Sequence, residues 1–358
     1  MSGSCLRQWF VLVLFMVVTG LACAGKEKLH DVDISLRSIV PEDPRDPRAI
    51  LDHPGAIQCL GEGRLAVLDV GRSRVVVFDR NGNYVRQIGR KGRGPGELLN
   101  PVDMAVGPDA KVYVLDSGNR RLSIFDSTGV FLSSFRVPAR YLGPNTRIAV
   151  SPDRMIYAHL PEFDSLFTVF SPNGRLVGRF GSLRAYDYPV NSIHARMLFN
   201  SIAFGFDRRG YLYVLFLNLP YLRIYDRNWL LLLEKRIETS DMEVVRKAYE
   251  RNLARHRVPG AGMVMFPQYF WDMVVCPSGH AIAVIGGPQV KAYYLLGPSG
   301  SILAKLRPQP ETKAPYAKRI CCCLTDVYVS EDLSYGISAF ELPTELFQVN
   351  RGRSFPSH

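Results

Sequence analysis

The chain has 358 residues, of which 47% are hydrophobic, and a formal net charge of +11 at pH 7. This apolar content excludes an intrinsically disordered chain and is sufficient for a sizeable core. The length fits one large all-β domain or two medium-sized domains. The seven cysteines are too sparse for a small scaffold held together mainly by disulfides.

The first 24 residues have the features of a secretory signal: Arg7, then an apolar run over 9–18, then small residues. The run is too short to span the ~30 Å hydrocarbon core comfortably as a transmembrane helix. The sequence Leu21-Ala22-Cys23 also resembles the bacterial lipoprotein box, in which Cys23 would carry the lipid. We therefore predict export and leave two outcomes open. The protein is either soluble in the periplasm or extracellular space, or anchored to the outer membrane through Cys23 alone.

A short turn sequence recurs along the chain at spacings of 47, 45, 55 and 71 residues, of which the last includes an insertion. Periods near 45 residues are typical of propellers. The copies are Phe78-Asp79-Arg80-Asn81-Gly82, Phe125-Asp126-Ser127-Thr128-Gly129, Phe170-Ser171-Pro172-Asn173-Gly174, Tyr225-Asp226-Arg227-Asn228 and Leu296-Gly297-Pro298-Ser299-Gly300. Each copy lies between two runs rich in β-forming residues, and a second turn precedes it. Each unit therefore has the strand and turn order of a four-stranded antiparallel blade.

Five units are complete, and a sixth begins near Ile320 but lacks one strand. Its strands are expected around 325–330, 335–340 and 346–349. The segment Asp31–Leu36 alternates as a strand should and belongs to no other unit. We expect it to complete the last blade, because an open ring would leave unpaired strand edges. The prediction is an all-β protein: a monomeric six-bladed β-propeller over 30–350, followed by a basic tail at 351–358.

Two motifs make the family resemblance specific. They are Gly94-Pro95-Gly96-Glu97-Leu98-Leu99-Asn100-Pro101 and Asp116-Ser117-Gly118-Asn119-Arg120-Arg121, with a relaxed copy of the second at Asp69–Arg74. They resemble the inter-blade signature and the Asp-x-Gly-Asn-x-Arg hairpin of NHL repeats, here in an exported bacterial type of six-bladed propeller. The resemblance is strong over 60–135 and limited to the repeat pattern beyond. It implies that Asp116 and Arg121 form an ion pair that holds the hairpin between the second and third strands.

An insertion between the fourth and fifth units predicts a helix over 240–256. Ser240-Asp241-Met242-Glu243 reads as a capping box that opens it. An apolar stripe follows at helical spacing, made of Met242, Val245, Tyr249 and Leu253. Because the helix links two blades, we expect it to lie across the channel entrance. There it would either pack over blade edges or form a wall of a binding site.

Five cysteines follow the predicted signal: Cys59, Cys276 and the run Cys321-Cys322-Cys323. Successive strand residues point to opposite faces, so the run cannot direct all three sulfurs to one metal ion. The favoured interpretation is that these are small buried apolar side chains. One disulfide, or a metal or redox role, stays open.

The connections between blades carry most of the positive charge. The candidate ligand-binding residues are Arg90, Lys91, Arg93, Arg140, Arg147, Arg246, Arg251 and Arg319. Such a face would attract anions, although a basic surface can also serve only solubility. The main hypothesis is an exported, non-enzymatic binding or scaffold propeller without a cofactor. Its partner would be a protein, an anionic polysaccharide or a lipid head group, because export removes the chain from cytoplasmic nucleic acid.

The alternative is a metal-dependent hydrolase or lyase. Three carboxylates, Asp103, Asp272 and Asp326, are expected at the channel mouth and could hold a divalent cation. They could instead pair with the basic loops or only cap the turns of the blades. Propeller lactonases that resemble gluconolactonase place their ligands one residue earlier, where this chain has Val102, Trp271 and Thr325. Amidating lyases of the NHL type use zinc-binding histidines, but His159, His194 and His280 show no recognisable ligand spacing. The sequence has no phosphate-binding loop, nucleophile elbow or His-Glu-x-x-His motif.

Overall fold

The computed structural model describes residues 30–41, 44–160, 163–185, 193–255, 267–286, 290, 292–309, 317–323, 326–331, 336–343 and 346. The chain divides into two units, 1–30 and 31–358, and the second unit contains the blades. The predicted signal, Cys23 and the basic tail lie outside the described residues. In the described part of the chain, no helix is both long enough and apolar enough to cross a membrane.

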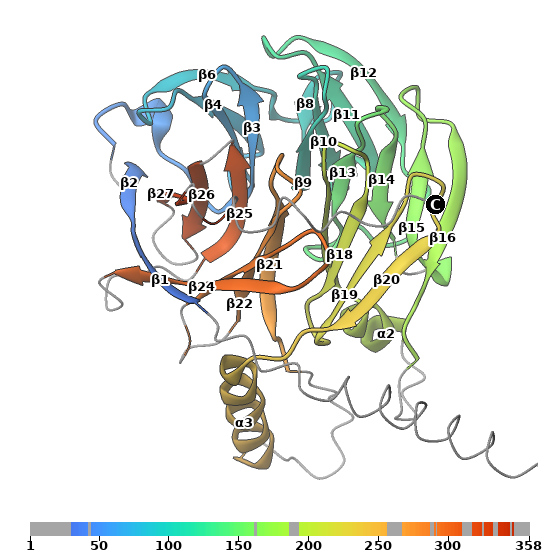
Figure 1. Ribbon diagram of the computed structural model, residues 1–358. Coiled ribbons are helices and arrows are strands. Elements are labelled where there is room, and N and C mark those ends of the chain that lie inside the picture. The colour runs from blue at the N-terminus through green and yellow to red at the C-terminus, as the bar shows by residue number, and fades with distance from the viewer. Residues whose placement is uncertain are drawn as a thin grey trace, which may run out of the picture. The chain divides into compact units, whose positions relative to one another are not determined.

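Six antiparallel sheets are arranged radially around a central channel (Figure 1). Blade one consists of β3 (Pro54–Gly61), β4 (Arg64–Asp69), β5 (Arg74–Phe78) and β6 (Tyr84–Ile88). Blade two consists of β9 (Pro101–Val106), β10 (Val112–Asp116), β11 (Arg121–Phe125) and β12 (Phe131–Arg136). The connection between them contains the short parallel pair β7 (Arg90–Lys91) and β8 (Glu97–Leu98). Blade three consists of β13 (Ile148–Val150), β14 (Ile156–His159), β15 (Ser165–Phe170) and β16 (Leu176–Ser182).

The second half of the ring follows the same plan. Blade four consists of β17 (Ile202–Phe206), β18 (Leu212–Phe216), β19 (Tyr221–Tyr225) and β20 (Leu231–Arg236), preceded by α2 (Ile193–Phe199). Blade five consists of β21 (Phe270–Val275), β22 (Ala281–Ile285), β23 (Tyr293–Leu296) and β24 (Ile302–Gln309), with β1 (His30–Ser35) added outside β24. Blade six consists of β25 (Ala317–Cys323), β26 (Asp326–Glu331), β27 (Ile337–Glu341) and β2 (Arg37–Val40). The 3-10 turns are η1 (Pro47–Ala49) and η2 (Ser117–Asn119).

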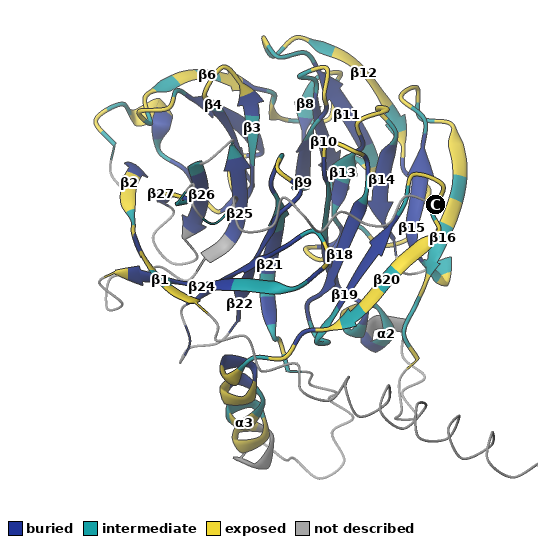
Figure 2. Ribbon diagram, viewed as in Figure 1, coloured by how far each residue is buried: buried dark blue, intermediate teal, exposed yellow. Residues whose placement is uncertain are grey.

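The core lies between blades, and this explains the hydrophobic patterns of the strands. The third strand of blade one, β5, is buried at every residue because both of its faces are covered by neighbouring sheets. The outermost strand, β6, alternates between half-buried and exposed residues over most of its length. Figure 2 shows the same contrast between inner and outer strands around the ring. One core cluster joins Val75 and Val77 of blade one to Met104 and Val114 of blade two.

The recurring turns form as predicted. In the first, the Asp79 carboxylate accepts hydrogen bonds from the backbone N–H groups of Asn81 (2.8 Å) and Asn83 (2.9 Å), and Gly82 has a φ of 81°. The fourth copy lacks its glycine, and Trp229 occupies the left-handed conformation with a φ of 68°. Its indole N–H donates to Tyr157 (2.9 Å) and its ring stacks on Phe180. These contacts offset the strain of a positive φ at a bulky residue.

An N-terminal strand closes the ring, as expected, but the predicted segment was wrong. The fourth strand of blade six is β2, whereas β1, which contains most of Asp31–Leu36, pairs with β24 of blade five. Asp31 and Asp33 on β1 form ion pairs with Arg307 on β24, at 3.4 and 3.3 Å. The inner strand of blade six is β25, one strand earlier than expected. Of the strand predicted at 346–349, only Leu346 is described, and it is not in a strand.

The predicted inserted helix is α3 (Ser240–Arg255). Its cap is Thr239 rather than Ser240, because the Thr239 hydroxyl accepts a hydrogen bond from the Met242 N–H (3.3 Å). The buried Asp241 accepts a hydrogen bond from Tyr294 (2.8 Å) and pairs with Lys305 (2.6 Å), both on outer strands of blade five. The expected position across the channel entrance was wrong: the helix lies at the rim (Figure 1), and no described residue of α3 lines the channel cavity.

Candidate functional site

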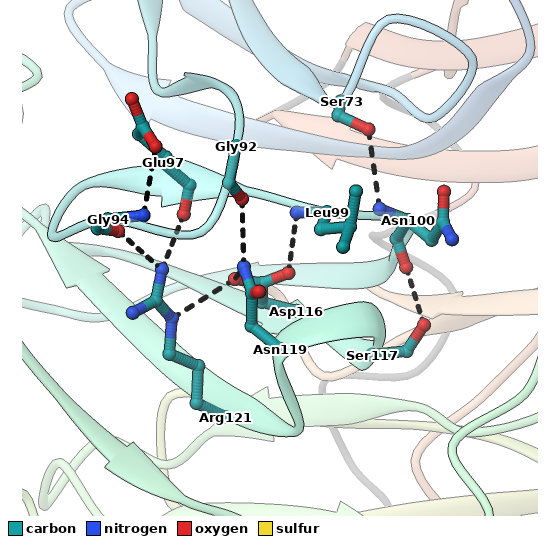
Figure 3. A network of polar contacts seen from close by, with 10 residues as sticks. All are labelled: Ser73, Gly92, Gly94, Glu97, Leu99, Asn100, Asp116, Ser117, Asn119 and Arg121. Atoms are coloured by element: carbon teal, nitrogen blue, oxygen red, sulfur yellow. Dashed lines mark hydrogen bonds and ion pairs between the residues drawn. The ribbon is translucent and has the colours of Figure 1, made fainter.

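The NHL-type hairpin of blade two is a fully hydrogen-bonded network (Figure 3). The buried Asp116 carboxylate accepts hydrogen bonds from the Leu99 N–H and the Asn119 amide, both at 2.7 Å, and pairs with Arg121 at 3.1 Å. Arg121 also donates to the carbonyls of Gly94 and Glu97, each at 2.7 Å. The predicted ion pair is confirmed. It ties the hairpin to the connection from blade one, so the surface above this junction is held in a defined shape.

One position per blade, on the inner strand or directly before it, defines a ring at the channel end where the inter-blade connections cross. In chain order its members are Ala56, Asp103, Arg147, Ala203, Asp272 and Arg319. They are equivalent because each lies opposite the corresponding residue of its second strand: Leu68, Leu115, His159, Leu215, Val284 and Ser330. The order alanine, aspartate, arginine therefore occurs twice around the channel. We call these six residues the charged ring.

The two halves of the charged ring make related contacts. The Asp103 carboxylate accepts the backbone N–H of Ile148 in the next blade (2.8 Å), and Asp272 accepts that of Ile320 (3.1 Å). Arg147 pairs with Asp272 at 2.7 Å, two blades further on. The equivalent pair, formed by Arg319 and Asp103, is looser at 3.9 Å. Each carboxylate thus satisfies an inner-strand N–H that would otherwise face the channel unpaired.

The charged ring borders a cavity of about 210 Å³ that runs down the channel past Val106, Phe206 and Val275. This volume is below the ~300–1,000 Å³ of sites for drug-sized ligands. Burial raises the pKa of Asp103, while Arg319 and Arg147 act in the opposite direction. Burial and the nearby charge of Arg147 lower the pKa of Arg319. The two aspartates and two arginines, when ionised, carry no net charge.

The predicted group of three carboxylates does not form. Asp103 and Asp272 lie together in the channel, but Asp326 is on β26 and pairs with Arg37 of β2 at 2.9 Å. The reason is that the inner strand of blade six is β25 and not the strand expected at 325–330. The residue of β25 equivalent to Asp103 is Arg319, and Asp326 lies on the second strand. The channel end therefore contains two carboxylates that each accept a backbone N–H, and of the two Asp272 also pairs closely with an arginine.

The predicted basic residues fall into three groups. Arg147 and Arg319 are inside the channel and not on a surface. Arg90 pairs with Glu97 at 3.0 Å, and Arg246 pairs with both Glu243 and Glu250. The exposed remainder consists of Lys91, Arg93, Arg140 and Arg251.

A surface depression of about 440 Å³ lies beside the blade-two hairpin, and we call it the blade-two hollow. Its lining residues are Asn119, Arg120, Arg121, Ser134, Phe135 and Arg136. The loop that carries Lys91 and Arg93 borders it, because Asn119 donates to the carbonyl of Gly92 (3.1 Å) and Arg121 to that of Gly94. In the described residues, no acidic side chain forms an ion pair with Lys91, Arg93, Arg120 or Arg136. Sequence reasoning missed Arg120 as a site residue; the extra arginine beside Arg121 was its only signal.

The cysteines form two disulfides, Cys59–Cys323 and Cys276–Cys322, so the favoured interpretation of them as apolar side chains was wrong. The predicted alternation holds, since Cys323 faces blade one and Cys322 faces blade five. Cys321 is a buried free thiol whose sulfur lies 3.3 Å from that of Cys59. Burial raises its pKa to about 12, which suppresses the reactive thiolate.

The described histidines do not form a zinc site. The buried His159 makes a hydrogen bond through Nδ1 with the carbonyl of Leu166 (2.8 Å), and His280 makes one with Ser278 in a turn of blade five (3.1 Å). His194 falls in α2. In the described part of the chain, the one group of side chains close enough to share a metal ion is Cys59, Cys321 and Cys323, two of which are disulfide-bonded to each other.

His159 predicts an acid-sensitive fold. Burial lowers its pKa to about 4, compared with about 6.5 in the unfolded chain, so the neutral form stabilises the fold above pH 6.5. This contribution is lost as the pH falls from 6.5 towards 4, and amounts to about 2.5 kcal/mol between pH 7.5 and 4.5. Urea unfolding at both values should show a correspondingly smaller acid loss for His159→Gln, which keeps a donor for Leu166. An equal loss in both proteins would contradict the assignment.

Six antiparallel blades around one channel define the protein as a six-bladed β-propeller. A family described as 6-bladed beta-propeller matches residues 48–165. The chain is also 35% identical over 120 residues to the human E3 ubiquitin-protein ligase NHLRC1, and the match covers 28% of this chain and 30% of that protein. The chain thus spans less than a third of this relative's length. Within the matched part, these likenesses and the blade-two hairpin make the chain similar to NHL-repeat propellers.

Solved structures agree on the fold. A putative exported protein from Bacteroides fragilis has a TM-score of 0.57 at 13% identity, over 88% of this chain and 96% of that chain. A streptogramin B lyase has a TM-score of 0.51 at 10% identity, over 87% and 98%. A gluconolactonase from Xanthomonas campestris has a TM-score of 0.51 at 13% identity, over 86% and 89%. At these identities the likeness concerns the fold alone, which hosts unrelated functions.

Proposed function

We propose that this chain is an exported, non-enzymatic binding protein whose blade-two hollow recognises an anionic partner. The observation that carries the proposal is the group of four cations around the hollow, Lys91, Arg93, Arg120 and Arg136, without acidic ion-pair partners in the described residues. Elsewhere on the predicted basic face, Arg90 and Arg246 are compensated by glutamates. Among the described residues of that face, cations without an acidic partner therefore gather around the blade-two hollow.

The hollow also has the rigidity that a binding site needs. Asn119 and Arg121, which line it, are held by Asp116 and by the carbonyls of the inter-blade connection. Phe135 adds an apolar side chain to its lining. When a partner binds to a preformed hollow, little free energy is lost in ordering its side chains and loops. An acidic polysaccharide or an anionic lipid head group would meet several cations at once, and such multiple contacts suit partners that carry repeated charges.

The hydrolase or lyase hypothesis has less support. It rested on three carboxylates. Asp326 lies apart from the others, Asp103 and Asp272 each accept a backbone N–H, and Asp272 also pairs with Arg147. His159 and His280 lie in different blades. The streptogramin B lyase and the gluconolactonase share only the fold with this chain. Export remains part of the proposal, supported by the features of residues 1–24.

The test is charge reversal in the hollow. The double variant Arg93→Glu, Arg136→Glu should weaken binding to a sulfated polysaccharide or to vesicles rich in phosphatidylglycerol by about 30-fold or more, at ~1 kcal/mol for each cation near an anionic surface. The measurement is a titration in low salt, repeated in high salt, where both proteins should bind weakly.

The matched control is Arg80→Glu, Arg175→Glu, which makes the same charge change at two exposed turn residues on the opposite side of the blades. This control should bind almost as the unmodified protein does. Equal losses in the two double variants would mean that only net charge matters. Either that result or unchanged binding by the hollow variant would overturn the proposal.

A further inference from the structure

The channel contains a guanidinium group with unusually few partners. Arg319 is 8% exposed and lines the channel cavity. In the described residues its ion pair is the contact with Asp103 at 3.9 Å, which is too long for a hydrogen bond. An arginine has five N–H donors in a planar fork, and donors that border a cavity without a protein acceptor are open to a ligand. Arg319 therefore has N–H donors at the cavity that no acceptor in the described residues occupies.

A second guanidinium borders the same cavity. Arg147 occupies the equivalent position in the other half of the charged ring and already pairs with Asp272 at 2.7 Å. It is close enough to disfavour the charged form of Arg319. Two like charges beside one small polar cavity are stabilised when an anion enters between them. Asp103 opposes an anion less than a solvent-exposed carboxylate would, because burial raises its pKa.

We propose that the channel cavity binds a small carboxylate, held by Arg319 with Arg147 as the second cation. The planar fork of a guanidinium matches the two oxygens of a carboxylate in a bidentate contact. The cavity of about 210 Å³ limits the ligand to a small organic acid. This site is separate from the blade-two hollow, so the inference goes beyond the proposed surface function.

Acetate is the probe. Thermal unfolding and isothermal titration of the full-length protein are measured with sodium acetate and with sodium chloride at matched ionic strength. Acetate should raise Tm saturably and titrate with a stoichiometry of one, whereas chloride should not. Ligands that bind only the folded state raise stability in this concentration-dependent manner.

Two variants of Arg319 test whether acetate binds in the channel cavity. Arg319→Gln should weaken acetate binding at least 10-fold, and Arg319→Lys, which keeps the charge but loses the fork, should weaken it as well. The hollow variant Arg93→Glu, Arg136→Glu should bind acetate normally, so failure of this inference and failure of the surface proposal can be distinguished. If Arg319→Gln does not fold, the titration of the unmodified protein and Arg319→Lys still decide. Absence of a saturable acetate effect, an equal effect of chloride, or full binding by a folded Arg319 variant would overturn the inference.

Discussion

A chain that starts at residue 41 is expected to lose the cooperative unfolding of the propeller, whereas a chain that starts at residue 37 should keep it. The difference between them is β2. Its Ile39 and Val40 are buried between blades six and one, and it pairs with β27. Two buried side chains of this size correspond to about 3–6 kcal/mol before lost strand pairing is added. This is a large part of the ~5–15 kcal/mol that stabilises a typical domain.

The chain that starts at residue 37 is the control, because it lacks β1 and keeps the fourth strand of blade six. Its main loss is the buried Ile34 and the ion pairs to Arg307, so a smaller decrease in stability is expected. Circular dichroism and urea unfolding of both proteins measure the difference. If the chain starting at 41 unfolds with the same midpoint as the chain starting at 37, β2 does not close the ring.

Loss of the two disulfides should have the second large effect. Cys59–Cys323 joins the inner strands of blades one and six, and Cys276–Cys322 joins the turn after the inner strand of blade five to the inner strand of blade six. Blade six, which contains both ends of the propeller chain, is therefore bonded covalently to each neighbour. Removal of either bond should cost about 2–5 kcal/mol. The first should cost about 1.5 kcal/mol more in the chain-entropy model, because it links residues separated by 264 positions rather than 46.

The experiment compares Cys59→Ala, Cys323→Ala with Cys276→Ala, Cys322→Ala in urea, with and without reductant. Reductant should lower the midpoint of the unmodified protein. Cys321→Ala is the control, since it removes the free thiol and leaves both bonds in place. Peptide mapping under non-reducing conditions identifies the bonds directly. A map without these pairs, or a reductant that leaves the unmodified midpoint unchanged, would refute the role of the disulfides.

Local patterns predicted most of the fold because each blade is a local structure. The Asp79 and Asp126 turns, the Asp116–Arg121 pair and the helix at 240–255 depend on residues close in sequence, and they formed nearly as expected. The weaker repeats at the end of the chain were harder. In blade six no recurring turn marks the first strand, so the register slipped by one strand, and Asp326 took the place that belongs to Arg319.

The sequence by itself determined that this chain forms six radial blades and that an N-terminal strand must close the last one. Hairpin turns and buried strands follow from residues a few positions apart, and unpaired edges are unfavourable in any arrangement. Only the tertiary structure decided which residues far apart in the sequence contact each other. Arg147 meets Asp272 two blades away in the channel, and Cys59 in blade one meets Cys323 in blade six. Such pairs depend on how successive blades rotate about the channel, so charges that looked like a basic surface became, in part, a neutral ring inside it.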